Sequence, residues 1–210
     1  MDGVNDGNDG RKCGYGQERV PCSRAQEPRT SQTGDGEHPM PFSERELDAT
    51  GRMLREHCGE RGMCDAIRMY LREPLDHWME TLRCGGDLGR ADMAALAVGM
   101  SRTLAIRDAL LISIIIDEER CPRELLLDFA SRPMLPRRLE ELLSASFHDA
   151  AAHPDMARCG RGIGMLLDII AMVPESYHVQ PLAVTGYILW WLGDDRAMPC
   201  AMRALAIDEG

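Results

Sequence analysis

The sequence is poor in lysine, in aromatic residues and in clustered positive charge. Lys12 is its only lysine, aromatic residues make up 5%, and the formal net charge is -10. The longest basic runs are the pairs Arg11-Lys12 and Arg137-Arg138. Because DNA and RNA are polyanions that bind clusters of Lys and Arg, we expect no nucleic-acid partner.

The sequence also lacks a long hydrophobic stretch. Its longest apolar segments, residues 109–116 and 181–192, are far shorter than the roughly 20 residues that a membrane-spanning helix needs. Residues 1–10 are polar and acidic and do not resemble a secretory signal. We therefore expect a soluble cytoplasmic protein without a membrane partner, in which the eight cysteines are reduced thiols.

Residues 1–40 contain no Leu, Ile or Phe but many Gly, Ser, Thr and Gln residues. Such a segment buries too little apolar surface to offset the entropy lost on ordering. We predict a disordered N-terminal tail over residues 1–42, followed by a single helical domain over residues 43–210.

Helix signals recur from Ser43 onwards. Ser43 and Glu46 have the spacing of a capping box, and Leu47 and Leu54 follow at helical intervals. Several prolines lie where an apolar helical stripe begins and are predicted to open helices: Pro74, Pro122, Pro136, Pro154 and Pro181. We predict an all-α fold, an irregular bundle or short stack of about eight to ten helices.

The apolar run at residues 109–116 is the main challenge to this prediction, because Leu and Ile in succession also favour a buried strand. We favour a helix, since the run continues from Arg107-Asp108 without a turn signal. No alternating apolar and polar run with a hairpin turn occurs to supply a partner strand.

Motifs that carry catalysis, cofactor binding or metal binding are absent from the sequence. The run Gly160-Arg161-Gly162-Ile163-Gly164 lacks the spacing of a phosphate-binding loop and the strand that precedes one. We interpret Gly160 and Gly164 as positions where a neighbouring helix approaches closely. No Cys or His pair has standard zinc spacing, and no nucleophile motif occurs. We predict no catalytic, cofactor-binding or metal-binding residue and no cofactor.

Two pairs of residues are structural or interaction candidates. Arg107 and Asp108 begin a very apolar predicted helix, where charged side chains need partners. We favour a structural ion pair over a pair that faces a ligand. Trp190 and Trp191 point about 100° apart on a helix. We favour burial of both indoles over exposure of one at a partner surface.

The C-terminal part carries a Trp-x-x-Gly-Asp turn, an Ala-rich helix and an Ala-Leu-x-x-Asp ending. These features resemble the actinobacterial family called domain of unknown function 4192, over residues 65–209. The matching residues are Trp78, Arg107, Asp108, Trp190, Trp191, Gly193, Asp194, Ala204, Leu205 and Asp208. The preference for Arg over Lys is typical of a high-GC genome and agrees with that source. Because the family has no established activity, the resemblance implies no catalytic residue.

The sequence departs from this family at three places. Residues 1–40 replace the apolar strands of its N-terminal part, and Asp195 stands where a small residue is usual. Pro199 lies in the last predicted helix, which we expect it to kink. Asp194 is predicted to cap that helix.

The last helical hairpin is also similar to a tetratricopeptide unit, through Ala197, Ala204, Leu205 and Asp208. No second copy occurs at a 34-residue period. The sequence therefore favours a non-enzymatic helical interaction or regulatory module that binds a protein partner or itself. The alternative is a small-molecule-binding protein or enzyme with a pocket near Arg107-Asp108.

Overall fold

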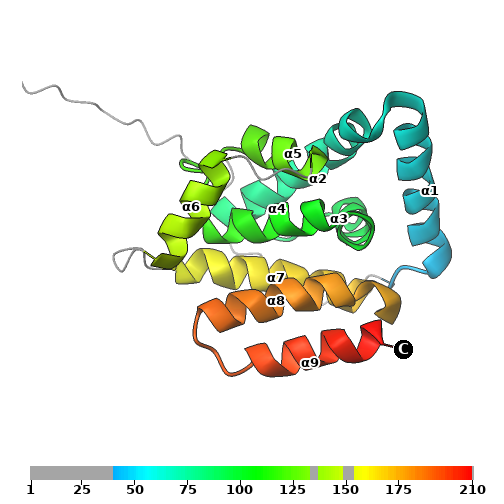
Figure 1. The fold of residues 1–210 in the computed structure, drawn as a ribbon. Helices are drawn as coiled ribbons and strands as arrows, with labels where there is room; N and C mark the ends of the chain where they lie inside the picture. The colour runs from blue at the N-terminus through cyan, green and yellow to red at the C-terminus, as the bar shows by residue number, and fades with distance from the viewer. Residues whose placement is uncertain (1–39, 133–136, 149–153, 210) are drawn as a thin grey trace, which may run out of the picture. The chain divides into compact units, whose positions relative to one another are not determined.

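The computed structural model describes residues 40–132, 137–148 and 154–209, which all belong to one unit of the chain, Gly36–Gly210. These residues form nine α-helices and one short 3-10 helix, and no strand occurs among them (Figure 1). The predicted all-α fold is therefore confirmed. The predicted tail lies outside the described residues up to residue 39. The helices are α1 Glu44–Arg61, α2 Met63–Cys84, α3 Arg90–Arg102, α4 Leu104–Ile115, α5 Arg123–Ser131, α6 Arg137–His148, α7 Met156–Met172, η1 Glu175–Tyr177, α8 Val179–Trp191 and α9 Ala197–Asp208.

The ordered core begins one residue earlier than predicted, because Phe42 belongs to it. Phe42 is buried, its backbone N donates to the carbonyl oxygen of Met172 at 2.7 Å, and the Arg90 guanidinium lies 3.8 Å from its ring centre. Ser43 then forms the predicted capping box. Its backbone N donates to Glu46 Oε2 at 2.7 Å, and Glu46 N donates to Ser43 Oγ at 3.4 Å. The assignment of Phe42 to the tail was wrong.

Pro74 was predicted to open a helix, but it lies inside α2. Its ring is buried within an apolar stripe that runs without a break from Leu71 to Trp78. A proline inside a helix costs about 3 kcal/mol through one lost hydrogen bond and a steric clash. Each large apolar side chain that becomes fully buried returns about 1.5–3 kcal/mol. Packing of the continuous stripe therefore outweighs the local penalty.

Three of the other prolines lie at helix starts, as predicted. Pro122 is the N-cap of α5, Pro154 precedes Asp155, the N-cap of α7, and Pro181 lies in the first turn of α8. The N–H groups of a first turn have no helical partner, so a proline costs little there. Pro136 lies outside the described residues.

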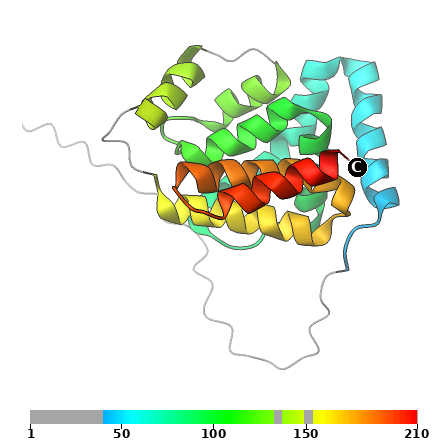
Figure 2. The same cartoon turned by 60° about the horizontal axis from the view of Figure 1, so that its bottom comes forward.

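The apolar run at residues 109–116 forms most of α4, so the strand alternative is excluded. α4 contacts α3, α5, α7 and α8. It lies between α5 on one side and α7 and α8 on the other (Figure 1 and Figure 2). A helix enclosed in this way buries apolar residues around its whole circumference. The strand-like composition of the run is therefore compatible with a central helix.

A buried polar network joins α2, α4 and α7. Trp78 is fully buried, and its Nε1 donates to Ser113 Oγ at 2.9 Å. Ser113 Oγ donates in turn to the carbonyl oxygen of Leu110 at 2.6 Å. Arg158 is buried as well, and its Nε and Nη2 donate to the Ser113 carbonyl oxygen at 2.8 and 2.6 Å. Since that carbonyl is in the last turn of α4, where no helical N–H reaches it, Arg158 caps α4.

The close approach of α7 to α4 depends on Gly162, and not on Gly160 and Gly164 as predicted. A Cβ atom at Gly162 would lie 2.7 Å from Cδ1 of Ile114. A Cβ atom at Gly160 or Gly164 would meet no atom within 4 Å. The middle glycine of the run is thus required for packing, whereas the outer two face open space.

Gly162→Ala is expected to lower the free energy of unfolding by about 1–3 kcal/mol, because the added methyl group forces Ile114 to move. Gly160→Ala and Gly164→Ala are expected to raise it by about 0.5–1 kcal/mol, because alanine is the better helix former. Urea unfolding followed by circular dichroism measures all three. Equal effects at the three positions would contradict the assigned packing.

Five of the described cysteines are free thiols: Cys58, Cys64, Cys121, Cys159 and Cys200. Burial raises the pKa of Cys121 and of Cys159 to about 11. These two thiols therefore act as small apolar core residues and not as nucleophiles.

Candidate functional site

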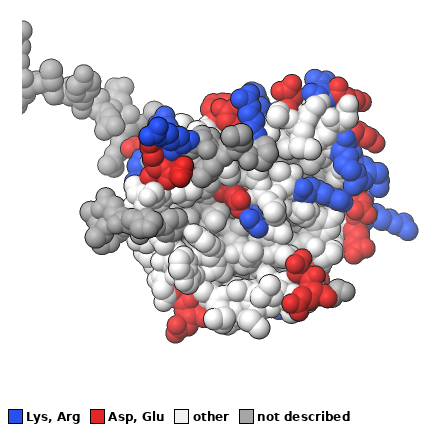
Figure 3. All heavy atoms as spheres, in the orientation of Figure 1, with Lys and Arg blue, Asp and Glu red and all other residues white. Residues whose placement is uncertain are grey.

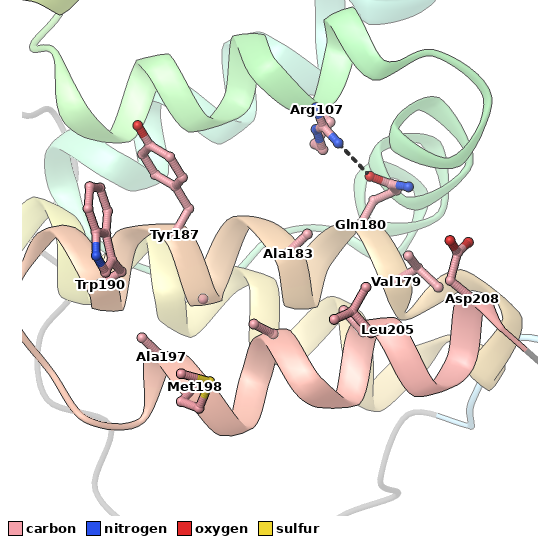
Figure 4. Close-up of a pocket in the computed structure, with 13 residues that line it drawn as sticks. Arg107, Val179, Gln180, Ala183, Tyr187, Trp190, Ala197, Met198, Leu205 and Asp208 are labelled. Atoms are coloured by element: carbon pink, nitrogen blue, oxygen red, sulfur yellow. Dashed lines mark hydrogen bonds between the residues drawn. The ribbon is translucent and has the colours of Figure 1, made fainter.

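A groove with a volume of about 590 Å³ runs along the hairpin of α8 and α9 (Figure 4). We call it the C-terminal groove. The residues that define it are Val179, Ala183 and Trp190 of α8 and Met198, Ala201 and Leu205 of α9. Among its lining residues only Arg107, from α4, and Asp208, at the end of α9, carry a charge.

α9 is apolar on almost every side, yet only Ala204 within it is buried. Arg203 is the only charged residue of α9 before Asp208. Met198 and Leu205 are 68% and 55% exposed. Charged side chains gather over the other helices on the face drawn in Figure 3, and few lie over α8 and α9. A helix that is apolar all round is usually enclosed, so α9 presents an apolar surface without a partner.

The turn between α8 and α9 is a Schellman motif. Gly193 adopts φ 72°, and its N donates to the carbonyl oxygen of Trp190 at 3.0 Å. Asp194 N donates to the carbonyl oxygen of Leu189 at 2.9 Å. Glycine adopts this left-handed conformation at little cost. Gly193 therefore closes the hairpin and brings the end of α8 beside the start of α9.

Asp194 was predicted to cap α9, but it does not. The helix begins later, at Ala197, and its N-cap is Arg196. Asp194 instead accepts from the backbone N of Arg196 at 2.9 Å and from its Nη2 at 2.6 Å. These hydrogen bonds lower the pKa of Asp194 to about 2. The later start also places Pro199 in the first turn, where it removes no helical hydrogen bond. Pro199 therefore gives no reason for the kink that was predicted in α9.

The two adjacent tryptophans have different environments, so the prediction that both are buried was wrong for one of them. Trp190 is 64% exposed, and its ring centre lies 5.6 Å from that of Tyr187. Trp191 is partly buried against the core. α8 packs on both α7 and α9, and the 100° between neighbouring residues turns only one indole toward the core.

Arg107 and Asp108 form the predicted ion pair, at the edge of the C-terminal groove. Arg107 Nη2 lies 2.7 Å from Asp108 Oδ1, and its Nη1 donates to Gln180 Oε1 at 3.1 Å. Both side chains are half-buried, and only Arg107 lines the groove (Figure 4). The hydrogen bond from Arg107 to Gln180 joins α4 to α8, which is a structural role.

The structure thus gathers some of the predicted residues and leaves others apart. Arg107 and Trp190 line the C-terminal groove. Gly193 and Asp194 shape its hairpin, and Trp78 is in the core. The apolar side chains of α9 were not predicted as site residues. The scarcity of charged residues in this helix is visible in the sequence and is a signal that could have indicated them.

A second cleft, of about 510 Å³, lies among α1, α2 and α3 and was not predicted. His77 Nδ1 lies 2.9 Å from Asp92 Oδ2, and His57 and Glu73 also line the cleft. These residues come from three helices, so no short sequence spacing could indicate them. The hydroxyl groups of Thr50 and Tyr70 also line the cleft, and they donate to the backbone carbonyl oxygens of Glu46 and Ala95.

No group of three or more His, Cys, Asp or Glu residues in the part of the chain that the structure describes is arranged to hold a metal ion. None of the helices there has the length and apolar composition needed to traverse a bilayer. The described polar groups therefore indicate no metal centre.

Comparison with known proteins adds no relative. No protein-family model matches the chain, and no curated protein and no solved structure matches it significantly. The resemblances to domain of unknown function 4192 and to a tetratricopeptide unit stay predictions. What the C-terminal groove does must follow from its own residues.

Proposed function

We propose that residues 40–209 form a non-enzymatic protein-interaction module that binds an α-helix of a partner protein in the C-terminal groove. The observation that carries the proposal is the exposure of Trp190 and Met198, 64% and 68%, at an otherwise largely apolar groove. Tryptophan is favoured at the energetic centre of interfaces. Methionine adapts its shape to apolar partners.

The energetics of such a contact suit a reversible interaction. A helix in the groove would cover Trp190, Met198 and Leu205, which are all more than half exposed. Each such side chain contributes on the order of 1–3 kcal/mol when it is covered. Association has to offset a loss of translational and rotational freedom of about 4 kcal/mol or more. These three side chains therefore leave at most about 5 kcal/mol, an affinity on the order of 0.1–1 mM.

The second candidate function is small-molecule binding, which the volume of the C-terminal groove favours. Ligand pockets typically have volumes of about 300–1,000 Å³, and the groove has about 590 Å³. Such sites also need free polar groups to orient a ligand. Arg107 is already held by Asp108 and Gln180. Asp208, at the end of α9, is then the one charged lining residue without a described ion pair, so the groove supports an apolar helix better than a polar metabolite.

The remaining expectations stay predictions. They are a cytoplasmic location, an actinobacterial source, membership of domain of unknown function 4192 and the absence of enzymatic activity. The proposal for the C-terminal groove does not depend on any of them.

A photo-cross-linking side chain in place of Met198 tests the proposal. In extracts of the cells that make the protein, it is expected to cross-link to one dominant partner, and mass spectrometry should locate the link on an amphipathic helical segment. The matched control carries the same side chain at Met63, which is 64% exposed on α2 and distant in sequence from the groove.

Equal cross-linking of the same proteins from Met63 would show non-specific capture and contradict the proposal. Links from Met198 only to strands or loops would also contradict it. Competition by an excess of unlabelled protein, but not by its Met198→Glu variant, is the further expected result.

A further inference from the structure

We propose that the partner helix is basic at both ends, with an apolar face of two to three turns between clusters of Lys or Arg. This inference rests on the proposed function of the C-terminal groove and names the chemistry of its partner. Acidic side chains lie at both ends of the α8–α9 hairpin, whereas its middle is almost uncharged (Figure 3).

The middle of the hairpin provides the apolar contact. α8 has no charged residue from Val179 to Trp191. In α9, Arg203 is the only charged residue before Asp208, and it does not line the groove. A helix of 12 residues, the length of α9, is about 18 Å long. A partner helix can therefore contact the groove over two to three turns.

The turn between α8 and α9, which adjoins the groove at Ala197 and Met198, carries excess negative charge. Asp194 and Asp195 oppose only Arg196 there. Asp194 already forms an ion pair with Arg196, whose Nη2 lies 2.6 Å from Asp194 Oδ2. Asp195 is exposed and makes no ion pair with the residues that the structure describes. Asp195 is therefore the carboxylate available to a partner at this end.

The opposite end is acidic as well. Asp208 lines the groove, is exposed and makes no described ion pair, and Glu209 follows it. The nearby Arg203 is 3.8 Å from Glu175, so its charge is already balanced. Arg107 is balanced by Asp108. Both ends of the groove therefore attract positive charge.

This charge pattern distinguishes the possible occupants. A second copy of the chain lying along the hairpin, parallel or antiparallel, would bring its own acidic hairpin ends against these, and like charges that face each other oppose association. An anionic lipid surface would be repelled for the same reason. A helix with basic ends satisfies both the apolar middle and the two acidic ends.

Three synthetic 16-residue peptides test the inference. All three carry Leu at helical positions i, i+3, i+4 and i+7, and they differ only in four terminal residues, which are Arg, Gln or Glu. Calorimetry with the full chain is expected to give affinities in the order Arg, Gln, Glu. We expect the Arg peptide to bind about ten-fold more tightly than the Glu peptide at low salt, with a smaller ratio at high salt, where surface charges are screened.

Asp195→Asn with Asp208→Asn is expected to reduce the ratio of the Arg and Glu peptide affinities to below three-fold. The matched control is Glu60→Gln with Asp65→Asn, two exposed acidic residues of α1 and α2. This control should leave the ratio unchanged.

The failures are distinguishable. Equal binding of the Arg and Glu peptides would overturn the charge inference and leave the proposed function intact. Binding of none of the peptides would overturn both. A dimer in sedimentation, or binding to phosphatidylserine vesicles, that Met198→Glu abolishes would assign the groove to a second copy or to a membrane and would overturn the inference.

Discussion

Trp78→Ala is expected to lower the free energy of unfolding by about 3–5 kcal/mol, the cost of truncating a large buried aromatic side chain. Trp78 is fully buried in α2, and its Nε1 donates to Ser113 Oγ in α4. The substitution leaves a cavity beside the central helix and removes one hydrogen bond. Since a domain is stable by only about 5–15 kcal/mol, the substitution should remove a large share of the protein's stability. Urea unfolding measures the change.

Trp78→Phe separates the two contributions. It keeps much of the ring volume and removes the hydrogen bond to Ser113 Oγ, which contributes about 0.5–1.5 kcal/mol. We expect a loss of about 1–2 kcal/mol. The loss in the double variant with Ser113→Ala should be smaller than the sum of the two single losses, because both changes remove the bond between Trp78 and Ser113. If the two losses were fully additive, the bond would not contribute as assigned.

Trp190→Ala is expected to weaken binding of the partner helix by about 30-fold or more, the effect of truncating an interface hot spot by at least about 2 kcal/mol. The free energy of unfolding should change by no more than about 0.5 kcal/mol, because the side chain is 64% exposed. Titration calorimetry with the partner segment and urea unfolding measure the two quantities.

Met63→Ala is the matched control for Trp190→Ala, because its side chain is equally exposed, at 64%, on α2. It should change neither binding nor stability. If Trp190→Ala lowered stability by several kcal/mol, Trp190 would have a structural role instead. If it left the affinity unchanged, the C-terminal groove would not be the binding site.

The sequence predicted the helical fold well because its signals are local. The capping box at Ser43 and the prolines at Pro122 and Pro154 act within one helical turn, and the structure places each at a helix start. Pro74 has the same local signal, but α2 continues through it. The apolar stripe of α2 on both sides of Pro74 is buried against other helices, and this burial keeps the helix continuous. It depends on tertiary packing and not on a local signal.

The site was predicted less completely, because it depends on which helix faces remain uncovered. Trp190 and Trp191 are neighbours with similar sequence properties, yet only Trp190 is mostly exposed. The order of the helices in space decides this difference. Likewise, His77 and Asp92 meet across two helices, and no spacing along the chain indicates that contact.

The single buried residue of α9 also has a consequence for how the molecule opens. Little apolar surface holds this helix in place, since only Ala204 is buried and α8 is its main neighbour. Elements with few buried contacts separate locally at a small fraction of the global unfolding free energy. The backbone amides of α9 are therefore expected to exchange with solvent sooner than those of the enclosed helix α4. A partner helix bound in the C-terminal groove would slow the hydrogen exchange of the α9 amides and hold α9 against α8.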